Sequence, residues 1–172
     1  MTTTITEFHD IRGKRCFPGP QDMIYERTAI YALLRCRGHV LLSWQDYAPG
    51  MAEFPGGGID PGEELRAALA RELREETELT LPRGEPTKTY SHVLGFYHED
   101  EDPHRYYACT RIYWVMDYPG PLPDPVTVTW TGPEGNRLQW VPMAHLPSLS
   151  FIHSHGLALK ELLEPSIEIG GV

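Results

Sequence analysis

GGGIDPGEELRAALARELREETEL, residues 56–79, is the stretch of this 172-residue chain that decides its fold. Three consecutive glycines open it, and glycine lets the backbone adopt positive φ or approach a ligand closely. The residues from 63 to 78 have high helical propensity, and no β-branched residue occurs among them before Thr77. We therefore expect a glycine-rich loop that leads into a helix.

The start of this helix is marked by three residues. Asp60, Pro61 and Glu63 stand where an N-cap, a proline at the first helical position and the acid of a capping box would stand. The same residues are also compatible with a helix that begins one turn later. The sequence leaves both starting points open.

Three glutamates lie close together on the expected helix. With a step of about 100° per residue, Glu72, Glu75 and Glu76 share an arc of about 100°. Leu69 and Leu73 border that arc, so the helix can bury an apolar stripe and keep the acids at its edge. Like charges at this spacing destabilise a helix. A divalent cation such as Mg²⁺, which binds carboxylate oxygens, would offset the repulsion.

A structural interpretation of these acids is the alternative. A run such as RELREE on a helix is usually a solvated face with salt bridges. The glycines upstream favour metal binding, because a strand, a glycine-rich loop and an acidic helix together form a cradle for a metal ion.

Residues 57–79 resemble the signature box of the Nudix hydrolases. The box reads glycine, five residues, Glu, seven residues, Arg-Glu, an apolar residue, any residue, Glu-Glu, any residue, glycine and an apolar residue. The positions in register are Gly57, Glu63, Arg71, Glu72, Leu73, Glu75, Glu76 and Leu79. One position departs from the pattern, because Glu78 replaces the second glycine. The change falls at the helix exit and leaves every acidic position of the box in place.

The resemblance assigns roles to the matching residues. Glu72, Glu75 and Glu76 match the metal-binding carboxylates of the family, and the carbonyl of Gly56 matches a backbone ligand found in several members. Glu63 and Arg71 match a pair that braces the loop against the helix.

One further acid is expected from a loop before the last strand. There the resemblance indicates Glu134, with Glu99 and Glu101 as alternatives. The general base is then Glu76 or Glu134, and the sequence does not choose between them.

The implied reaction is hydrolysis of a phosphoanhydride bond. Family members act on a nucleoside diphosphate linked to another group and use Mg²⁺, with Mn²⁺ as a substitute. Bound metal would neutralise the phosphates, polarise phosphorus and lower the pKa of a bound water. Here the substrate is expected to be of the nucleoside triphosphate or dinucleoside polyphosphate type. The alternative is a catalytically silent, Nudix-like regulatory domain that binds a nucleotide without cleaving it.

Substrate contacts are expected from four residues. Gly57 and Gly58 allow the backbone to approach the phosphates. Tyr97 lies 18 residues past Leu79, the neighbourhood in which family members that cleave dinucleoside polyphosphates carry a tyrosine. Arg105, at the end of an acidic loop, is expected to contact phosphate.

The rest of the chain predicts an α+β fold. The resemblance makes it a Nudix-type α/β/α sandwich, with a mixed β-sheet packed between helices, in a single domain of residues 1–172. The N-terminal arm is 1–22 and the loose tail 165–172. The predicted strands are 23–34 and 39–44 (a hairpin), 88–97, 105–116 and 137–141, and a short C-terminal helix is predicted at 157–163.

Composition limits the other classes of function. Fifteen Lys and Arg against twenty-four Asp and Glu give a net charge of −9, which disfavours a partner as negative as duplex nucleic acid. No apolar run is long enough for a membrane span, and the three cysteines fit neither a disulfide framework nor a metal site. These features predict a cytoplasmic protein, and because many relatives are dimers the resemblance allows a homodimer.

Overall fold

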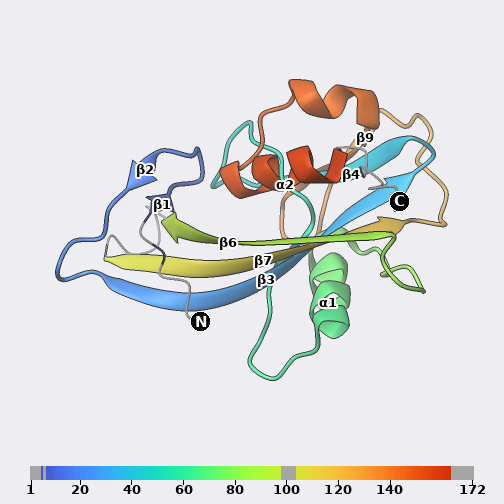
Figure 1. The fold of residues 1–172 in the computed structure, drawn as a ribbon. Helices are drawn as coiled ribbons and strands as arrows, with labels where there is room; N and C mark the ends of the chain where they lie inside the picture. Colours follow the sequence, from blue (N-terminus) through green and yellow to red (C-terminus); the bar gives the residue numbers. More distant parts are fainter. Residues whose placement is uncertain (1–4, 6, 98–103, 164–172) are drawn as a thin grey trace, which may run out of the picture.

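The structure, a computed structural model, describes residues 5, 7–97 and 104–163 and is built on one mixed β-sheet (Figure 1). The strands follow the order β2-β1-β6-β7-β3-β4-β9-β8, and β5 pairs with β3 beside this path. The strands are β1 (Phe8–His9), β2 (Arg15–Cys16), β3 (Met23–Cys36), β4 (His39–Trp44), β5 (Gly56–Gly58), β6 (Lys88–Tyr97), β7 (Arg105–Asp117), β8 (Thr129–Thr131) and β9 (Arg137–Pro142). The helices are α1 (Leu65–Thr77), the 3₁₀ helix η1 (Met143–Ser148) and α2 (His153–Leu163).

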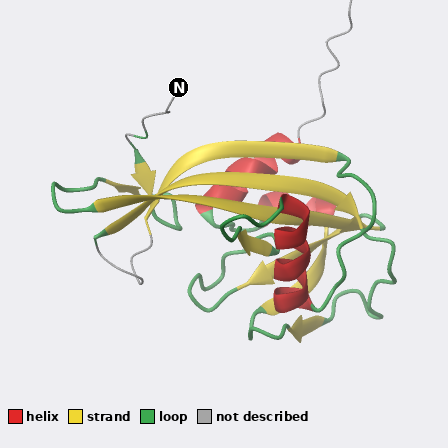
Figure 2. Ribbon diagram, turned by 90° about the horizontal axis from the view of Figure 1, so that it is seen from below, coloured by secondary structure: helices red, strands yellow, loops and turns green. Residues whose placement is uncertain are grey.

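Strand β3 lies at the centre and sends alternate side chains to opposite faces, as the pleat of a strand requires. The side chains on one face, those of Ala29, Tyr31 and Leu33, pack in the same hydrophobic cluster as Ala158 and Leu159 of α2. The side chains on the opposite face, those of Ile30, Ala32 and Leu34, pack with Ala68, Leu69 and Leu73 of α1. Helix α1 therefore covers one face and α2 the other (Figure 2). This confirms the predicted α/β/α sandwich.

Helix α1 begins at Leu65, four residues or about one turn after Pro61, which is the second of the two predicted starting points. The Glu63 side chain accepts the Asp60 N–H at 3.1 Å, and Gly62 has a φ of 81°, so residues 60–63 form a turn. Glu64 then occupies the N-cap position without a side-chain cap. The expected capping-box acid closes this turn instead.

The exit of α1 keeps its turn although the box glycine is absent. Glu78 adopts φ 61° and ψ 2°, the left-handed conformation that glycine adopts without strain. Its N–H bonds to the Arg74 carbonyl at 3.1 Å. The substitution is therefore accommodated at the cost of local backbone strain.

The predicted hairpin between β3 and β4 exists only at its turn. The two strands pair at Arg35 with Val40 and at Cys36 with His39, and β4 then pairs with β9. The long neighbour of β3 is β7, which runs parallel to it from Met23 to Arg35. This parallel pairing joins segments far apart in the sequence, so a local pattern could not indicate it.

The ends of the chain add short elements to this framework. In the predicted arm, β1 pairs with β2 and extends the sheet beside β6. Helix α2 begins at His153, four residues before the predicted start at residue 157, while the tail 165–172 lies outside the described residues. Across the described segments, no helix combines the length and apolar character needed to cross a membrane.

Candidate active site

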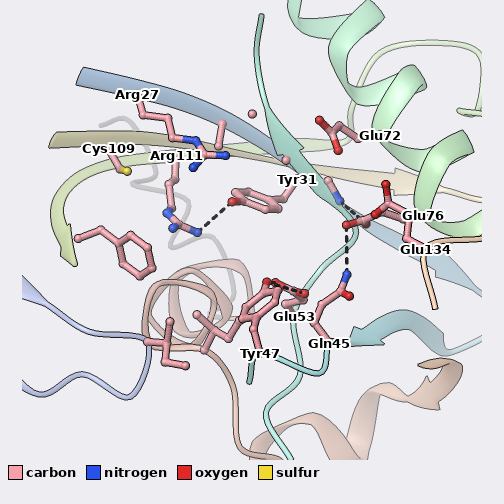
Figure 3. A pocket seen from close by; sticks show the side chains of 17 residues that line it. Arg27, Tyr31, Gln45, Tyr47, Glu53, Glu72, Glu76, Cys109, Arg111 and Glu134 are labelled. Carbon is pink, nitrogen blue, oxygen red and sulfur yellow. Dashed lines mark hydrogen bonds between the residues drawn. The ribbon is translucent and has the colours of Figure 1, made fainter. Parts of the chain in front are cut away.

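A cavity of about 440 Å³ opens where α1, β5 and the middle of β3 meet. Its wall includes Glu72, Glu76 and Glu134, which we call the acidic end, and Arg27 and Arg111, which we call the arginine end (Figure 3). The backbone of all three glycines of β5 also lines it. The cavity thus gathers the glycine-rich segment and two of the three box glutamates that match metal-binding positions.

Glu76 is the most constrained side chain of the acidic end. It is 7% exposed, and one carboxylate oxygen accepts the Gly56 N–H at 3.0 Å. Gly56 has a φ of 138°, and a Cβ there would collide with the Ile30 carbonyl, so only glycine brings this amide into place. Burial, followed by the negative charge of Glu53, raises the pKa of Glu76 well above its usual range.

Glu72 lies directly beside the glycine strand. A Cβ on Gly57 would lie 2.6 Å from one of its carboxylate oxygens. Arg71 donates to Glu72 at 2.7 Å, yet burial outweighs this partner and raises the pKa of Glu72. Carboxylates that resist ionisation because they are removed from solvent are a fit environment for a divalent cation.

Glu134 reaches the acidic end through the turn between β8 and β9. Gly132 in this turn packs so closely on the Glu76 carbonyl that a Cβ would collide with it. The turn is closed by Gly132 N–H to the Asn136 carbonyl at 2.8 Å, and Asn136 donates to Ser43 at 2.9 Å. Glu134 itself is exposed and adds negative charge beside Glu72 and Glu76.

Glu63 and Arg71 tie the loop to α1. Arg71 donates to both oxygens of Glu63, at 3.0 and 2.8 Å, and to the Gly58 carbonyl at 3.0 Å. The hydrogen bonds from Arg71 lower the pKa of Glu63. The same guanidinium donates to Glu75 at 3.2 Å. Glu75 is 47% exposed and lies outside the cavity wall, so its role as a metal ligand stays a prediction.

Glu53 is a cavity residue that the sequence analysis missed. It is 6% exposed, and Tyr47 donates to its two carboxylate oxygens at 3.0 and 2.8 Å. Burial raises the pKa of Glu53 to about 7, and the Tyr47 hydrogen bond opposes the shift. The available signal was an acid inside the otherwise apolar stretch MAEFP, directly before the glycines.

The arginine end was also missed, because Arg27 and Arg111 come from different strands. The expected phosphate contact, Arg105, instead lies over the Tyr25 ring at 5.2 Å. Tyr97 stacks on Tyr106 with ring centroids 4.8 Å apart. Neither Arg105 nor Tyr97 lines the cavity. Glu99 and Glu101, the alternatives to Glu134, lie outside the described residues.

The residues present fit a metal ion by their chemistry. In the segments that the structure describes, no three acidic, His or Cys side chains are already grouped at metal-binding distances. The acidic end nevertheless brings carboxylates with raised pKa values together beside a glycine backbone. Hard oxygen donors of this kind suit Mg²⁺ or Mn²⁺.

Comparison with known folds agrees with this architecture. The family model described as NUDIX domain matches residues 24–162. The MutT NUDIX hydrolase of Burkholderia pseudomallei is similar over 80% of this chain and 98% of its own, with a TM-score of 0.57 and 21% identity. The NUDIX domain of Shewanella oneidensis NrtR, solved with ADP ribose, is similar over 84% and 90%, with a TM-score of 0.55 and 19% identity. At these identities the likeness concerns the fold.

Sequence relatives match a shorter part of the chain. The nucleoside triphosphatase NudI of Klebsiella pneumoniae is 42% identical over 55 residues, which are 29% of this chain and 38% of that protein. NudI of a second strain is 38% identical over 55 residues, 39% of its length. The chain therefore matches about two fifths of the length of these relatives.

Proposed function

This chain belongs to the Nudix family, and on that premise we propose that it hydrolyses a phosphoanhydride bond in a nucleotide with the help of Mg²⁺. The substrate is a nucleoside diphosphate linked to another group, of the nucleoside triphosphate or dinucleoside polyphosphate type. Mn²⁺ would substitute for Mg²⁺. A homodimer and a cytoplasmic location stay predictions.

The observation that carries this proposal is the convergence of Glu72, Glu76 and Glu134 on one cavity wall beside the glycine strand. Glu72 and Glu76 would hold the metal together with the Gly56 carbonyl, and Glu75 would join them by leaving Arg71. Bound metal would neutralise the phosphates and lower the pKa of a water molecule. The acidic protein, with its net charge of −9, needs such a cation to admit a polyphosphate.

The remaining residues hold this arrangement in place. The Gly56 N–H fixes Glu76, and the Arg71–Glu63 contacts fix the loop that carries the glycines. Of the two candidates for the general base, Glu134 is favoured, because it is exposed and makes no ion pair with the described residues. Glu76 is already engaged with a backbone amide. A base in this position contributes about 10²–10⁴-fold to the rate.

The alternative is a nucleotide-binding regulatory domain without turnover. It is disfavoured because every acidic position of the box is retained, and two of these acids line the cavity. An assay of a panel of nucleotides in Mg²⁺ distinguishes the two functions, with hydrolysis measured as the release of phosphate or pyrophosphate. We expect turnover of at least one nucleotide, loss in EDTA and recovery with added Mg²⁺. Tight binding of one nucleotide without any turnover would support the regulatory domain instead.

A further inference from the structure

Arg111 is a buried cation in the cavity wall, and Glu53, the carboxylate whose negative charge acts on it, lies beyond ion-pair distance. Arg111 is 7% exposed, and its side chain lines the cavity. One guanidinium nitrogen donates to the Tyr31 hydroxyl at 3.0 Å, while the buried Nε has no acceptor. Within the described residues, no carboxylate forms an ion pair with it. Burying a charge in this way costs free energy unless an anion accompanies it.

The surroundings of Arg111 hold the guanidinium in position. Its central carbon lies 5.0 Å from the centre of the Phe96 ring and 5.4 Å from that of Tyr31. Aromatic faces attract a guanidinium and leave its N–H donors directed along the ring plane. Arg111 is therefore prepared to bind a planar or tetrahedral anion with little loss of side-chain freedom.

Arg27 adds a second positive charge to the same wall. Arg27 pairs in register with Cys109, and Ala29 pairs with Arg111, so the two arginines come from adjacent parallel strands. The Arg27 guanidinium lies beside Gly58, where a Cβ would be 3.3 Å from it. Arg27 likewise has no ion pair with the described carboxylates. Two such cations in one cavity repel each other unless an anion lies between them.

The arginine end adjoins the acidic end along the same cavity wall. Tyr31 pairs with Gly56, whose amide holds Glu76, so Tyr31 marks the position of the acids along β3. The Arg27 backbone lies four residues away, roughly 13 Å along an extended strand, and its guanidinium reaches back to Gly58, next to the Gly57 that Glu72 borders. In Figure 3 the Tyr31 ring lies between Arg111 and Glu76, with both arginines to the left of the ring and Glu72 and Glu76 to its right.

We propose that Arg27 and Arg111 bind a phosphate of the substrate that lies beyond the diphosphate held at the acidic end. This rests on the proposed function for the placement of the diphosphate. Guanidinium groups bind phosphate through paired N–H donors, which suits a buried site for this anion. The substrates are then nucleotides with a third phosphate, rather than nucleoside diphosphates linked to a neutral group such as a sugar.

Binding of inorganic phosphate to the metal-free protein tests this site without any turnover. Titration calorimetry in EDTA should show saturable binding by the unmodified protein and a loss of about tenfold or more in affinity in R111Q and in R27Q. Arg35→Gln is the matched control, because Arg35 lies outside this cavity and forms an ion pair with Asp117 at 2.9 Å. Unchanged affinity in R27Q and R111Q, or no saturable binding by the unmodified protein, would overturn the proposal. If R111Q does not fold, R27Q alone decides.

A kinetic comparison identifies the source of the third phosphate. The unmodified protein should prefer a nucleoside triphosphate or a dinucleoside tetraphosphate to a nucleoside diphosphate sugar. For the nucleoside triphosphate or the dinucleoside tetraphosphate, whichever carries the bound phosphate, R111Q should raise KM and lower kcat/KM by about tenfold or more. For the nucleoside diphosphate sugar, the same variant should leave kcat/KM nearly unchanged. Equal losses on all three would contradict the assignment. If no substrate is turned over, the proposed function fails, whereas the phosphate titration still decides this site.

Discussion

The two ends of the cavity are built in opposite ways. The acidic end takes Glu72 and Glu76 from one helix, and the backbone of the neighbouring glycine strand holds them. The arginine end takes one residue from each of two parallel strands and holds Arg111 by aromatic rings. A contiguous motif therefore specifies most of the first end, to which the turn between β8 and β9 adds Glu134, whereas tertiary pairing of β3 with β7 creates the second.

The charges of the two ends need opposite partners. At the acidic end, burial raises the pKa of both Glu72 and Glu76, so ionising them is costly until a cation is present. At the arginine end, a guanidinium remains charged at any ordinary pH and needs an anion. On the proposed function, a metal-bound polyphosphate would supply both partners at once.

Replacing the acids one at a time should disrupt the acidic end alone and gives the largest expected effects. E76Q should lower kcat/KM on the order of 10³-fold and raise the Mg²⁺ concentration needed for half-maximal rate. E134Q should lower kcat by about 10²–10⁴-fold with the Mg²⁺ requirement unchanged, because a base is lost and not a ligand. Initial rates measured across a Mg²⁺ series separate the two outcomes.

The control for these variants is E78Q, which changes an exposed charge at the same end of α1 and should keep the activity. Phosphate binding at the arginine end should survive in both E76Q and E134Q. An unchanged rate in E76Q would remove that residue from the mechanism, and a shifted Mg²⁺ requirement in E134Q would make it a metal ligand.

Glu53 interacts electrostatically with Glu76 of the acidic end and with Arg111 of the arginine end. The variant E53Q should change the pH dependence of the protein's stability. The pKa of Glu53 is raised by burial to about 7, so the folded protein holds a proton that the unfolded chain releases near pH 4.5. Stability should therefore fall as the pH rises from about 4.5 to 7, by up to about 3 kcal/mol. E53Q should remove this loss and be more stable than the unmodified protein at pH 8.

Urea unfolding of the metal-free proteins at pH 5 and pH 8 measures this difference. Y47F is a useful companion, because Tyr47 hydrogen bonds lower the pKa of Glu53 and their loss should steepen the pH dependence. Parallel stability curves for E53Q and the unmodified protein would show that the buried carboxyl does not titrate in this range.

The smallest expected effect concerns the exit of α1, outside both ends. E78G should stabilise the fold by about 1 kcal/mol, because glycine relieves the left-handed strain and removes a negative charge from the helix C-terminus. E78A removes the charge but keeps the strain, and so should gain less. Thermal unfolding ranks the three proteins, and equal midpoints would mean that the exit turn is not strained.

The sequence predicted the elements whose pattern is local. Helix α1 and its acids follow from residues 56–79, and the sheet between two helical layers follows from the resemblance. The three glycines were expected as a loop and instead form β5, because they pair with β3. The residue at which α1 begins stayed open, because Glu63 can serve either a capping box or a turn, and its bonds with Asp60 and Arg71 decide for the turn. Glu134 was indicated by the resemblance, as an acid in the loop before the last strand, and the loop between β8 and β9 places it in the cavity wall.

The rest of the site depends on contacts between distant segments. Arg27 and Arg111 look like ordinary polar residues in two predicted strands, and only the parallel register of β3 and β7 brings them together. Glu53 looks like one acid among many until Tyr47 and the cavity enclose it. Tyr97 and Arg105 have side chains suited to binding a nucleotide, yet they lie at the last residue of β6 and the first residue of β7, outside the cavity wall.

Tyr31 links both ends through a single strand position. Its backbone pairs with Gly56, while its hydroxyl accepts a hydrogen bond from Arg111. A deletion of one residue between Arg27 and Tyr31 would turn either Arg27 or Tyr31 toward the opposite face of the sheet. Evolution of this gene is therefore constrained in the length of this segment as well as in its side chains, because losing a single residue would take one of these two side chains out of the cavity.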